Sequence, residues 1–261
     1  MPSKFSAERT SADNPAERPI RERQLAAYHR ALHYIKGFRV LELGCGEGIG
    51  SYLLAEKAAC VVAVDYSEEA LYSARLRYGD RGIDFRFMKV PPIDFREASF
   101  DAVICFQMIE HLDTPQKLVA EVQRVLVNDG LALFATVNKE ESITQNPYHL
   151  HEFGAHELKD LLLSHFPQVE MYGVFGDELF ARYWENNRKW AANFMRLDVF
   201  GLAKHLPHKL KAPLFDAASR LMRTRLEQHD PRLCSTITYK NFAFQADSFE
   251  GCLDFFAVCQ K

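Results

Sequence analysis

The sequence predicts an α/β fold: a doubly wound, mostly parallel sheet of seven strands, with a helical insertion before the last strands. Two observations predict it. Short, β-branched apolar runs alternate with segments whose apolar residues recur every three or four positions. This alternation stops at residue 177, and strand-like runs return after residue 235. Alternating strands and helices build a parallel sheet through right-handed crossovers, so the interruption indicates an insertion.

Five runs predict the parallel part of the sheet. Four of them are short and apolar enough for strands buried on both faces, and the run at 83–88 fits a less apolar strand. The five runs occupy residues 39–43, 60–65, 83–88, 101–106 and 131–137. Helical periodicity occupies the intervals before and between them, at residues 19–36, 49–57, 67–77 and 115–126. A helix at 155–165 and strands at 168–176, 238–245 and 253–260 complete the pattern.

The same pattern predicts how the chain is organised. Residues 1–18 are small and polar, and we expect them to be flexible. Residues 19–176 form the core, residues 177–235 a helical, basic insertion or lid, and residues 236–261 the final strands of the core.

Composition limits the classes of function. The chain has 261 residues, of which 48% are hydrophobic, so it can bury a substantial core. Its formal net charge is -3, which argues against a protein dominated by nucleic-acid contacts, and we expect no nucleic-acid partner.

Cysteine usage and hydropathy predict the compartment. The six cysteines form no CxxC pair, and most lie in apolar runs, so we expect buried free thiols in a reducing compartment. We see no signal-peptide core and no apolar run near the ~20 residues that span a bilayer. The sequence therefore predicts a cytoplasmic protein.

A glycine-rich loop follows the first predicted strand. Gly44, Gly46, Gly48 and Gly50 alternate with other residues before the next helix, and the following strand ends in Asp65. Glycines at the carboxyl edge of a sheet let a ligand lie against the backbone, and a carboxylate there can accept both hydroxyls of a ribose. The alternative is a tight turn followed by a solvated Asp. The order of strand, loop, helix, strand and Asp favours a nucleoside-containing cofactor.

Two common nucleotide motifs are absent. A dinucleotide fingerprint needs G-x-G-x-x-G, but its last position would be Ile49 or Ser51 here. No Gly-Lys-Ser/Thr sequence indicates a phosphate-binding loop of the Walker A type.

The chain contains "VLELGCGEGIG", followed by "VVAVDYS", "SFDAVICFQMIEHL" and "VLVNDGLALFATVN". Together these stretches resemble the class I S-adenosylmethionine-dependent methyltransferases, which have a Rossmann-like fold, and in particular their domain types 11 and 23. The resemblance implies S-adenosyl-L-methionine as cofactor. It implies that residues 42–48, namely Glu42, Gly44, Cys45, Gly46 and Gly48, wrap the methionine part. It further implies ribose binding by Asp65 and additional cofactor contacts from Tyr66, Val90 and Phe106. Met88–Lys89 departs from the Gly-Asp that the family often has.

Histidines on two loops are the candidate catalytic residues. His111 follows the fourth predicted strand beside Glu110, and His149 and His151 follow the fifth. A hydroxyl acceptor needs a general base, and histidine is the usual one near neutral pH. We expect His149 or His151 to act as the base or to orient the acceptor. We expect His111, together with Glu110, to stabilise the loop and the floor of the pocket rather than to act as the base.

A metal site is the alternative. "MIEHL" resembles the E-x-x-E-H segment of ubiquinone-pathway O-methyltransferases and of small-RNA 2′-O-methyltransferases, which add a later histidine and bind a divalent ion. Glu110, His111 and His149 match that pattern, but Gln107 stands in place of the first glutamate. Losing one anionic ligand weakens the binding of a hard cation, so we predict no metal.

Weaker resemblances concern the acceptor. The first helix, "NPYHLHEF" and the closing "LDFFAVCQK" resemble bacterial methyltransferases of polysaccharide and glycolipid assembly, which implies a sugar hydroxyl as acceptor. That resemblance also implies a contact of Tyr28 near the cofactor's carboxylate. "NPY" follows the fifth strand and has one proline, so it predicts a turn and favours oxygen over nitrogen as acceptor.

The insertion is strongly basic. Between Arg188 and Leu226 there are nine basic residues and only two acidic ones, interleaved with large apolar residues. The pattern is compatible with a lid that covers the acceptor pocket, with peripheral contact to a membrane surface, or with nucleic-acid binding.

The sequence thus predicts an S-adenosylmethionine-dependent methyltransferase that acts on a small-molecule or glycolipid hydroxyl by in-line transfer. A metal-assisted, quinone-pathway type of O-methyltransferase, a non-catalytic cofactor-binding subunit and a membrane-surface module remain alternatives. The oligomeric state stays open.

Overall fold

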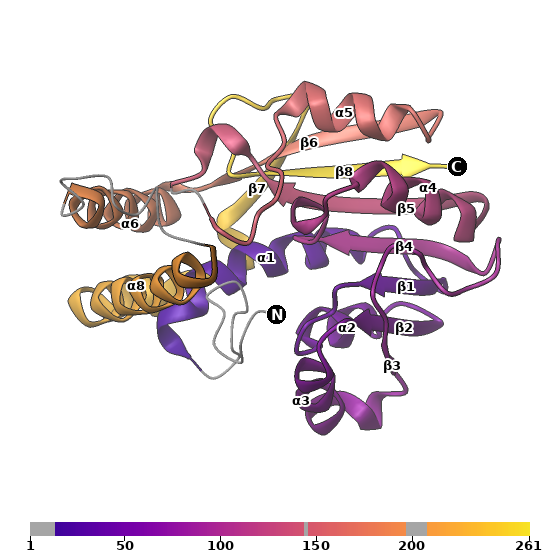
Figure 1. Ribbon diagram of the computed structural model, residues 1–261, viewed down its shortest axis with the longest axis horizontal. Coiled ribbons are helices and arrows are strands. Elements are labelled where there is room, and N and C mark those ends of the chain that lie inside the picture. Colours follow the sequence, from indigo (N-terminus) through magenta and orange to yellow (C-terminus); the bar gives the residue numbers. More distant parts are fainter. Residues whose placement is uncertain (1–13, 144–145, 197–207) are drawn as a thin grey trace.

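A computed structural model describes residues 14–143, 146–196 and 208–261. In it, eight strands form a single sheet, in the order β3-β2-β1-β4-β5-β8-β6-β7 (Figure 1). The strands are β1 (Arg39–Leu43), β2 (Cys60–Asp65), β3 (Asp84–Phe87), β4 (Phe100–Phe106), β5 (Leu126–Val137), β6 (Gln168–Gly176), β7 (Phe242–Ala246) and β8 (Asp254–Gln260). The predicted α/β class with a mostly parallel sheet is confirmed.

The number of strands differs from the predicted seven. Strands β1 to β5 pair in parallel, whereas β8 lies antiparallel between β5 and β6. Eight strand-like runs are nevertheless marked in the sequence, and the run at 238–245 supplies the edge strand β7, which pairs antiparallel with β6. Its expected first residues instead form the 3-10 turn Tyr239–Asn241, so the strand begins at Phe242.

Helices cover both faces of the sheet because successive strand residues point to opposite sides. On one face, Val40 packs in a core with residues of α1 (Arg18–Ala31), α2 (Ile49–Leu54) and α3 (Glu68–Tyr78). On the other face, Leu41 packs in a core with α4 (Pro115–Val125) and α5 (Ala155–Leu163). Both Val40 and Leu41 are fully buried, as expected for a central strand of a doubly wound sheet.

The predicted insertion is helical where the structure describes it. It contains α6 (Glu178–Arg196), α8 (His208–His229) and α9 (Pro231–Thr236). Helices α6 and α8 pack against each other, and Figure 1 shows them projecting beyond the sheet beside the start of α1. Most of the segment expected to be flexible, residues 1–13, lies outside the described residues, and Pro15–Glu17 forms a short 3-10 helix before α1.

Two further expectations concern cysteines and membrane spans. All six cysteines are free, and only Cys60 among them is exposed. Within the described ranges, no helix combines the length and the apolar character that crossing a bilayer requires.

Candidate active site

The glycine loop lies between β1 and α2, at the carboxyl edge of the parallel strands. Gly44, Gly46 and Gly48 have φ angles of +76°, +53° and +84°, which side chains rarely adopt. A Cβ at Gly46 would meet no atom within 4 Å, so the loop presents bare backbone to open space there. The loop therefore has the shape of a cradle for a ligand.

Packing accounts for the other two glycines. A Cβ at Gly48 would lie 2.9 Å from the Ala74 side chain, and a Cβ at Gly50 would lie 2.2 Å from the ring of Tyr28. These glycines let α3 and α1 approach the start of α2. The alternating glycines thus have two physical causes, space for a ligand and close packing of helices. The sequence predicted only the first.

Backbone amides of the loop hold its conformation. Gly44 and Cys45 donate to the carbonyl of Val64 over 2.8 and 3.0 Å. The amide of Gly46 donates to Oδ2 of Asp65 at 2.9 Å, and Oδ1 accepts from the amide of Ser67 at 2.8 Å. Asp65 therefore joins the ends of β1 and β2. A carboxylate oxygen can accept more than one hydrogen bond, which is compatible with the ribose contact predicted for it.

Glu42 lies behind the loop and is only 1% exposed. Its carboxylate accepts hydrogen bonds from the Tyr28 hydroxyl at 2.8 Å and from the Ser51 hydroxyl at 2.5 Å. Burial raises the pKa of Glu42 to about 7, although both hydrogen bonds oppose that shift. The ring of Phe106 packs edge-on against Tyr28, with ring centroids 4.9 Å apart. Three predicted cofactor residues in this part of the site, Tyr28, Glu42 and Phe106, thus form one connected group.

Two other predicted cofactor residues lie outside this group. Tyr66 directly follows Asp65 in the chain, and Val90 lies in the segment after β3. Tyr66 is 43% exposed, and its aromatic ring offers a surface for a base beside the ribose-binding position. Val90 is partly buried and packs against the core on the α4 side of the sheet. Their cofactor contacts remain predictions.

A cavity of about 200 Å³ lies where β4 and β5 end. Its walls come from α1, α6, α8, the short helix η3 (Ile109–His111) after β4 and the segment after β5. Cavities at the carboxyl edge of a parallel sheet are the usual ligand sites of such folds. This cavity is therefore the candidate site of the acceptor.

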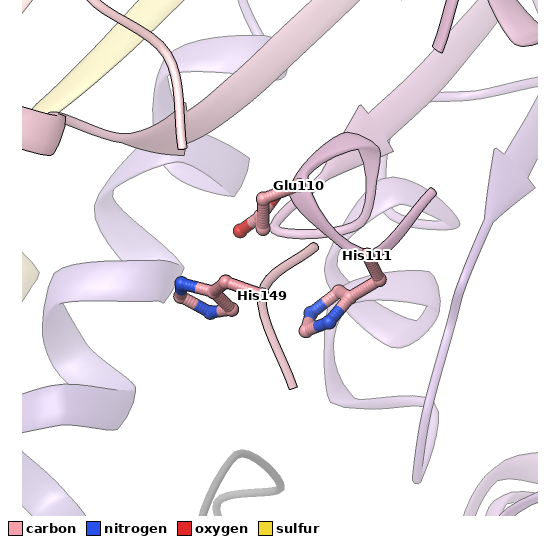
Figure 2. Close-up of side chains that lie close together, drawn as sticks. All are labelled: Glu110, His111 and His149. Carbon is pink, nitrogen blue, oxygen red and sulfur yellow. The ribbon is translucent and has the colours of Figure 1, made fainter. Parts of the chain in front are cut away.

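Glu110, His111 and His149 meet at the cavity (Figure 2). One potential ligand atom from each lies within 4.8 Å of those of the other two. Oε2 of Glu110 accepts from the Thr136 hydroxyl at 2.9 Å, whereas its buried Oε1 has no partner among the described residues. Burial raises the pKa of Glu110, and the two histidines oppose that shift. We call these three side chains the acid–histidine cluster.

Backbone hydrogen bonds bring the two histidine loops together. The amides of Leu150 and His151 both donate to the carbonyl of Glu110, at 2.9 and 3.0 Å. Nδ1 of His111 lies 3.0 Å from the carbonyl oxygen of Tyr148. These contacts join segments almost forty residues apart, which is why spacing in the sequence does not reveal the cluster.

His149 is held at both ring nitrogens. Its Nδ1 lies 2.6 Å from Oε1 of Glu152, and its Nε2 lies 2.9 Å from the amide nitrogen of Asn146. Because that amide nitrogen donates, Nε2 is the acceptor and Nδ1 carries the proton toward Glu152. This tautomer leaves Nε2 as the basic atom.

His151 has a different environment. Its Nε2 lies 2.6 Å from Oε1 of Glu157, and its ring packs edge-on against Phe153. His151 does not line the cavity. Of the three candidate histidines, the structure brings together His111 and His149 only.

The sequence interpretation missed a buried ion pair at the cavity. The guanidinium of Arg23 binds both carboxylate oxygens of Asp254, at 2.6 and 2.7 Å, and Oδ1 also accepts from Gln107 at 3.2 Å. Gln107 thus has a partner in Asp254 rather than a place in the acid–histidine cluster. The available signal was a charged residue at the start of the otherwise apolar last strand, and its partner lies 231 residues away.

Comparison with known sequences finds methyltransferases among the similar proteins. A family model described as a methyltransferase domain matches residues 41–134. A protein of Mycolicibacterium smegmatis, named a probable S-adenosylmethionine-dependent methyltransferase, is 35% identical over 66% of this chain and 68% of its own length. A protein of Mycobacterium tuberculosis with the same description is 36% identical over 66% of this chain and 64% of its own length.

A ubiquinone biosynthesis O-methyltransferase of Idiomarina loihiensis is 37% identical over 106 residues. These residues make up 40% of this chain and 44% of that enzyme. The chain thus spans about two thirds of the two mycobacterial proteins and less than half of this enzyme.

Solved structures show the same fold. A Thermotoga maritima methyltransferase, described as a possible histamine N-methyltransferase, superposes with a TM-score of 0.57 at 16% identity and covers 92% of this chain and 90% of its own. The Haemonchus contortus phosphoethanolamine N-methyltransferase 2, solved with S-adenosyl-L-methionine, gives a TM-score of 0.55 at 19% identity. It covers 90% of this chain and 51% of its own length.

Proposed function

Because this chain belongs to the S-adenosylmethionine-dependent methyltransferases, we propose that it methylates a hydroxyl oxygen of a sugar, a glycolipid or another small molecule. The superfamily, the enzyme class and the cofactor predicted from the sequence are confirmed. The hydroxyl acceptor is the proposal, and it rests on the acid–histidine cluster.

The glycine loop fits the cofactor. Gly46 leaves open space above bare backbone, the buried Glu42 lies behind the loop, and Asp65 and Tyr66 stand at the end of the next strand. When bound, S-adenosyl-L-methionine supplies a methyl group that is already activated by a positively charged sulfur. The work left to the protein is to align a nucleophile, exclude water and accept a proton.

Among the possible acceptor atoms, a hydroxyl oxygen would gain most from the base that the acid–histidine cluster provides. A neutral hydroxyl is a poor nucleophile and gains most from a base within hydrogen-bonding reach. Nε2 of His149 is the basic atom, and the proton on Nδ1 is held by Glu152 at 2.6 Å. That carboxylate would stabilise the imidazolium formed when Nε2 accepts the hydroxyl proton. For this to happen, the acceptor must replace the Asn146 amide at Nε2.

Metal assistance is a second candidate, favoured by the same cluster. Two imidazoles and a buried carboxylate oxygen without a described partner converge within 4.8 Å, and such a set suits a divalent ion. The relatives named ubiquinone biosynthesis O-methyltransferases match the quinone-pathway alternative in part. Here Glu110, His111 and His149 would hold the ion, which would lower the pKa of a bound hydroxyl.

Peripheral membrane contact would suit a glycolipid acceptor. Trp190, Leu214 and Leu221 are exposed large apolar residues on α6 and α8, within the basic insertion. Apolar side chains among basic ones favour an anionic membrane surface. Sedimentation with phosphatidylglycerol vesicles at low salt tests this part, and Leu214→Glu with Leu221→Glu should abolish it.

The proposed function is tested by following S-adenosylhomocysteine release with hydroxylated and amino acceptors. The hydroxylated probes are methyl glycosides and catechol, and the amino probes are the corresponding amino sugars and benzylamine. Turnover with a hydroxylated probe, and mass spectrometry that locates the methyl on oxygen, would support the proposal. Turnover with the amino probes alone, with the methyl on nitrogen, would contradict it.

A further inference from the structure

Helix α6 of the insertion presents one face to the acceptor cavity. Trp184, Asn187 and Ala191 line it, and their spacing of three and four residues places them on the same side of the helix. None of them has a role in the proton transfer proposed above. They line the same cavity as the acid–histidine cluster, which raises the question of what they bind.

Two polar atoms on this face have no hydrogen-bond partner among the residues that the structure describes. Nε1 of Trp184 and Oδ1 of Asn187 are both buried and form no hydrogen bond within the described part of the chain. The Asn187 side chain is only 6% exposed. Buried donors and acceptors are almost always paired in folded proteins, so an unpaired donor and an unpaired acceptor one helical turn apart require an explanation.

The indole of Trp184 is held in place by its ring surfaces. Phe180 stacks on it with ring centroids 5.7 Å apart, and the guanidinium carbon of Arg23 lies 4.9 Å from the ring centroid. Arg23 is itself held by Asp254. The ring surfaces are thus used for packing, and the N–H edge is the part of the indole left for recognition.

Three of the charged residues that line the cavity are held in ion pairs within the protein. Arg23 pairs with Asp254, and Glu141 pairs with Arg188 at 2.6 Å. A charged acceptor would have to compete with these pairs, whereas a neutral acceptor would leave them intact.

We propose that Trp184 and Asn187 are specificity residues that bind a neutral, hydroxylated acceptor. The indole N–H would donate to an oxygen of the acceptor, and the Asn187 carbonyl would accept from one of its hydroxyls. A hydroxyl offers both a donor and an acceptor, so neighbouring hydroxyls of one molecule satisfy both groups. Both protein atoms are out of reach of water in this structure, so binding includes a side-chain movement in the cavity wall. This inference rests on the proposed function.

The first experiment measures thermal unfolding of the full-length protein without acceptor. If Asn187 is unpaired until the acceptor binds, Asn187→Leu should raise the melting temperature by about 2–4 °C. Asn138→Leu is the matched control, because Asn138 lines the same cavity and is buried, but its amide donates to the Cys252 carbonyl and its oxygen accepts from the Glu140 amide. That control should lower the melting temperature. If Asn187→Leu lowers it as much as the control, Asn187 is structural and the inference is wrong.

The second experiment compares neutral and anionic probes in the methyltransferase assay. Methyl glucoside and catechol should be methylated in preference to glucuronic acid and protocatechuic acid. Asn187→Leu and Trp184→Phe should each raise KM for the neutral probe at least tenfold, with affinity for S-adenosylmethionine unchanged by calorimetry. Glu185→Gln, which alters an exposed side chain of the same helix outside the cavity, should not change KM.

The two proposals fail in different ways. An unchanged KM in both variants, or preference for the anionic probes, would overturn the role of Trp184 and Asn187 but not hydroxyl methylation. Methylation of amines alone would overturn the proposed function, whereas the melting temperatures would still decide whether Asn187 is a structural residue.

Discussion

The hydroxyl of Tyr28 donates to Oε1 of Glu42 over 2.8 Å, and the same tyrosine ring occupies the space in which a side chain at residue 50 would lie. Helix α1, the end of β1 and the start of α2 are therefore joined at one point behind the glycine loop. The conformation of the cofactor loop depends on a helix that precedes the sheet in the chain. This dependence leads to the first prediction.

Replacement of Gly50 by Ala should displace Tyr28, because the new Cβ would lie 2.2 Å from its ring. We expect a loss of about 1–3 kcal/mol in the free energy of unfolding, the usual cost of overpacking. Affinity for S-adenosylhomocysteine should fall as well. Urea unfolding and calorimetry measure both effects. Gly79→Ala is the control, since a Cβ at Gly79 meets no atom within 4 Å, and equal losses in both variants would contradict the explanation.

The buried Glu42 should make stability depend on pH. Its pKa rises from 4.5 to about 7 in the folded protein, so the folded state retains a proton that the unfolded state releases between these values. The contribution of Glu42 to the free energy of unfolding is therefore largest below pH 4.5. This contribution falls by roughly 3 kcal/mol as the pH rises to 7.

Glu42→Gln isolates this contribution, because glutamine can still bond to Tyr28 and Ser51 but does not titrate. Urea unfolding between pH 4.5 and pH 8 should show a smaller decline for the variant than for the wild type. Parallel declines would show that Glu42 does not carry the effect.

The ribose contact predicted for Asp65 should appear in cofactor affinity. Asp65→Ala removes a carboxylate that holds the amides of Gly46 and Ser67 and that could accept the ribose hydroxyls. We expect dissociation constants for S-adenosylmethionine and S-adenosylhomocysteine to rise tenfold or more, which is about 1.4 kcal/mol or above. Asp80→Ala, at an exposed position, is the control for calorimetry. Unchanged affinity in a folded Asp65→Ala protein would remove Asp65 from the site.

His149 and His151 are separated by one residue but should differ in catalysis. His149→Gln removes the basic atom in the cavity, and we expect kcat to fall by about 10²-fold or more with unchanged cofactor affinity. His151→Gln should have little effect, because that ring lies outside the cavity and contacts Glu157. Steady-state kinetics with a hydroxylated acceptor distinguish the two. The reverse result would place the base at His151.

Chelation separates the two modes of hydroxyl activation. If His149 acts as the base without a metal, extensive dialysis against EDTA should leave kcat unchanged. Loss of activity that Mn²⁺ or Mg²⁺ restores would favour the metal-assisted alternative, and His111→Ala should then abolish the restoration. Cofactor binding, measured in parallel, shows that the treated protein remains folded.

Much of the fold could be predicted from local pattern. The runs at 39–43 and 60–65 coincide with β1 and β2, and the helix predicted at 115–126 begins, as α4 does, at Pro115. Strand and helix periodicities are properties of consecutive residues, so a sequence reveals them directly. The glycine loop followed by Asp65 is also local, and it led to the correct cofactor.

Other features depend on residues that only the folded chain brings together. The place of β7 at the edge of the sheet depends on its pairing with β6 across the intervening insertion. The buried pair of Arg23 and Asp254 joins the first helix to the last strand. The need for glycine at residue 50 comes from Tyr28, a residue of another helix.

The histidines illustrate the same division. The sequence by itself determined that His111, His149 and His151 follow strands whose carboxyl ends share one edge of the sheet. Only the tertiary structure decided that His149 faces Glu110 and His111 whereas His151 turns to Glu157. The physical reason is that periodicity sets the path of the backbone, but the partner of a loop side chain depends on hydrogen bonds and packing between distant segments.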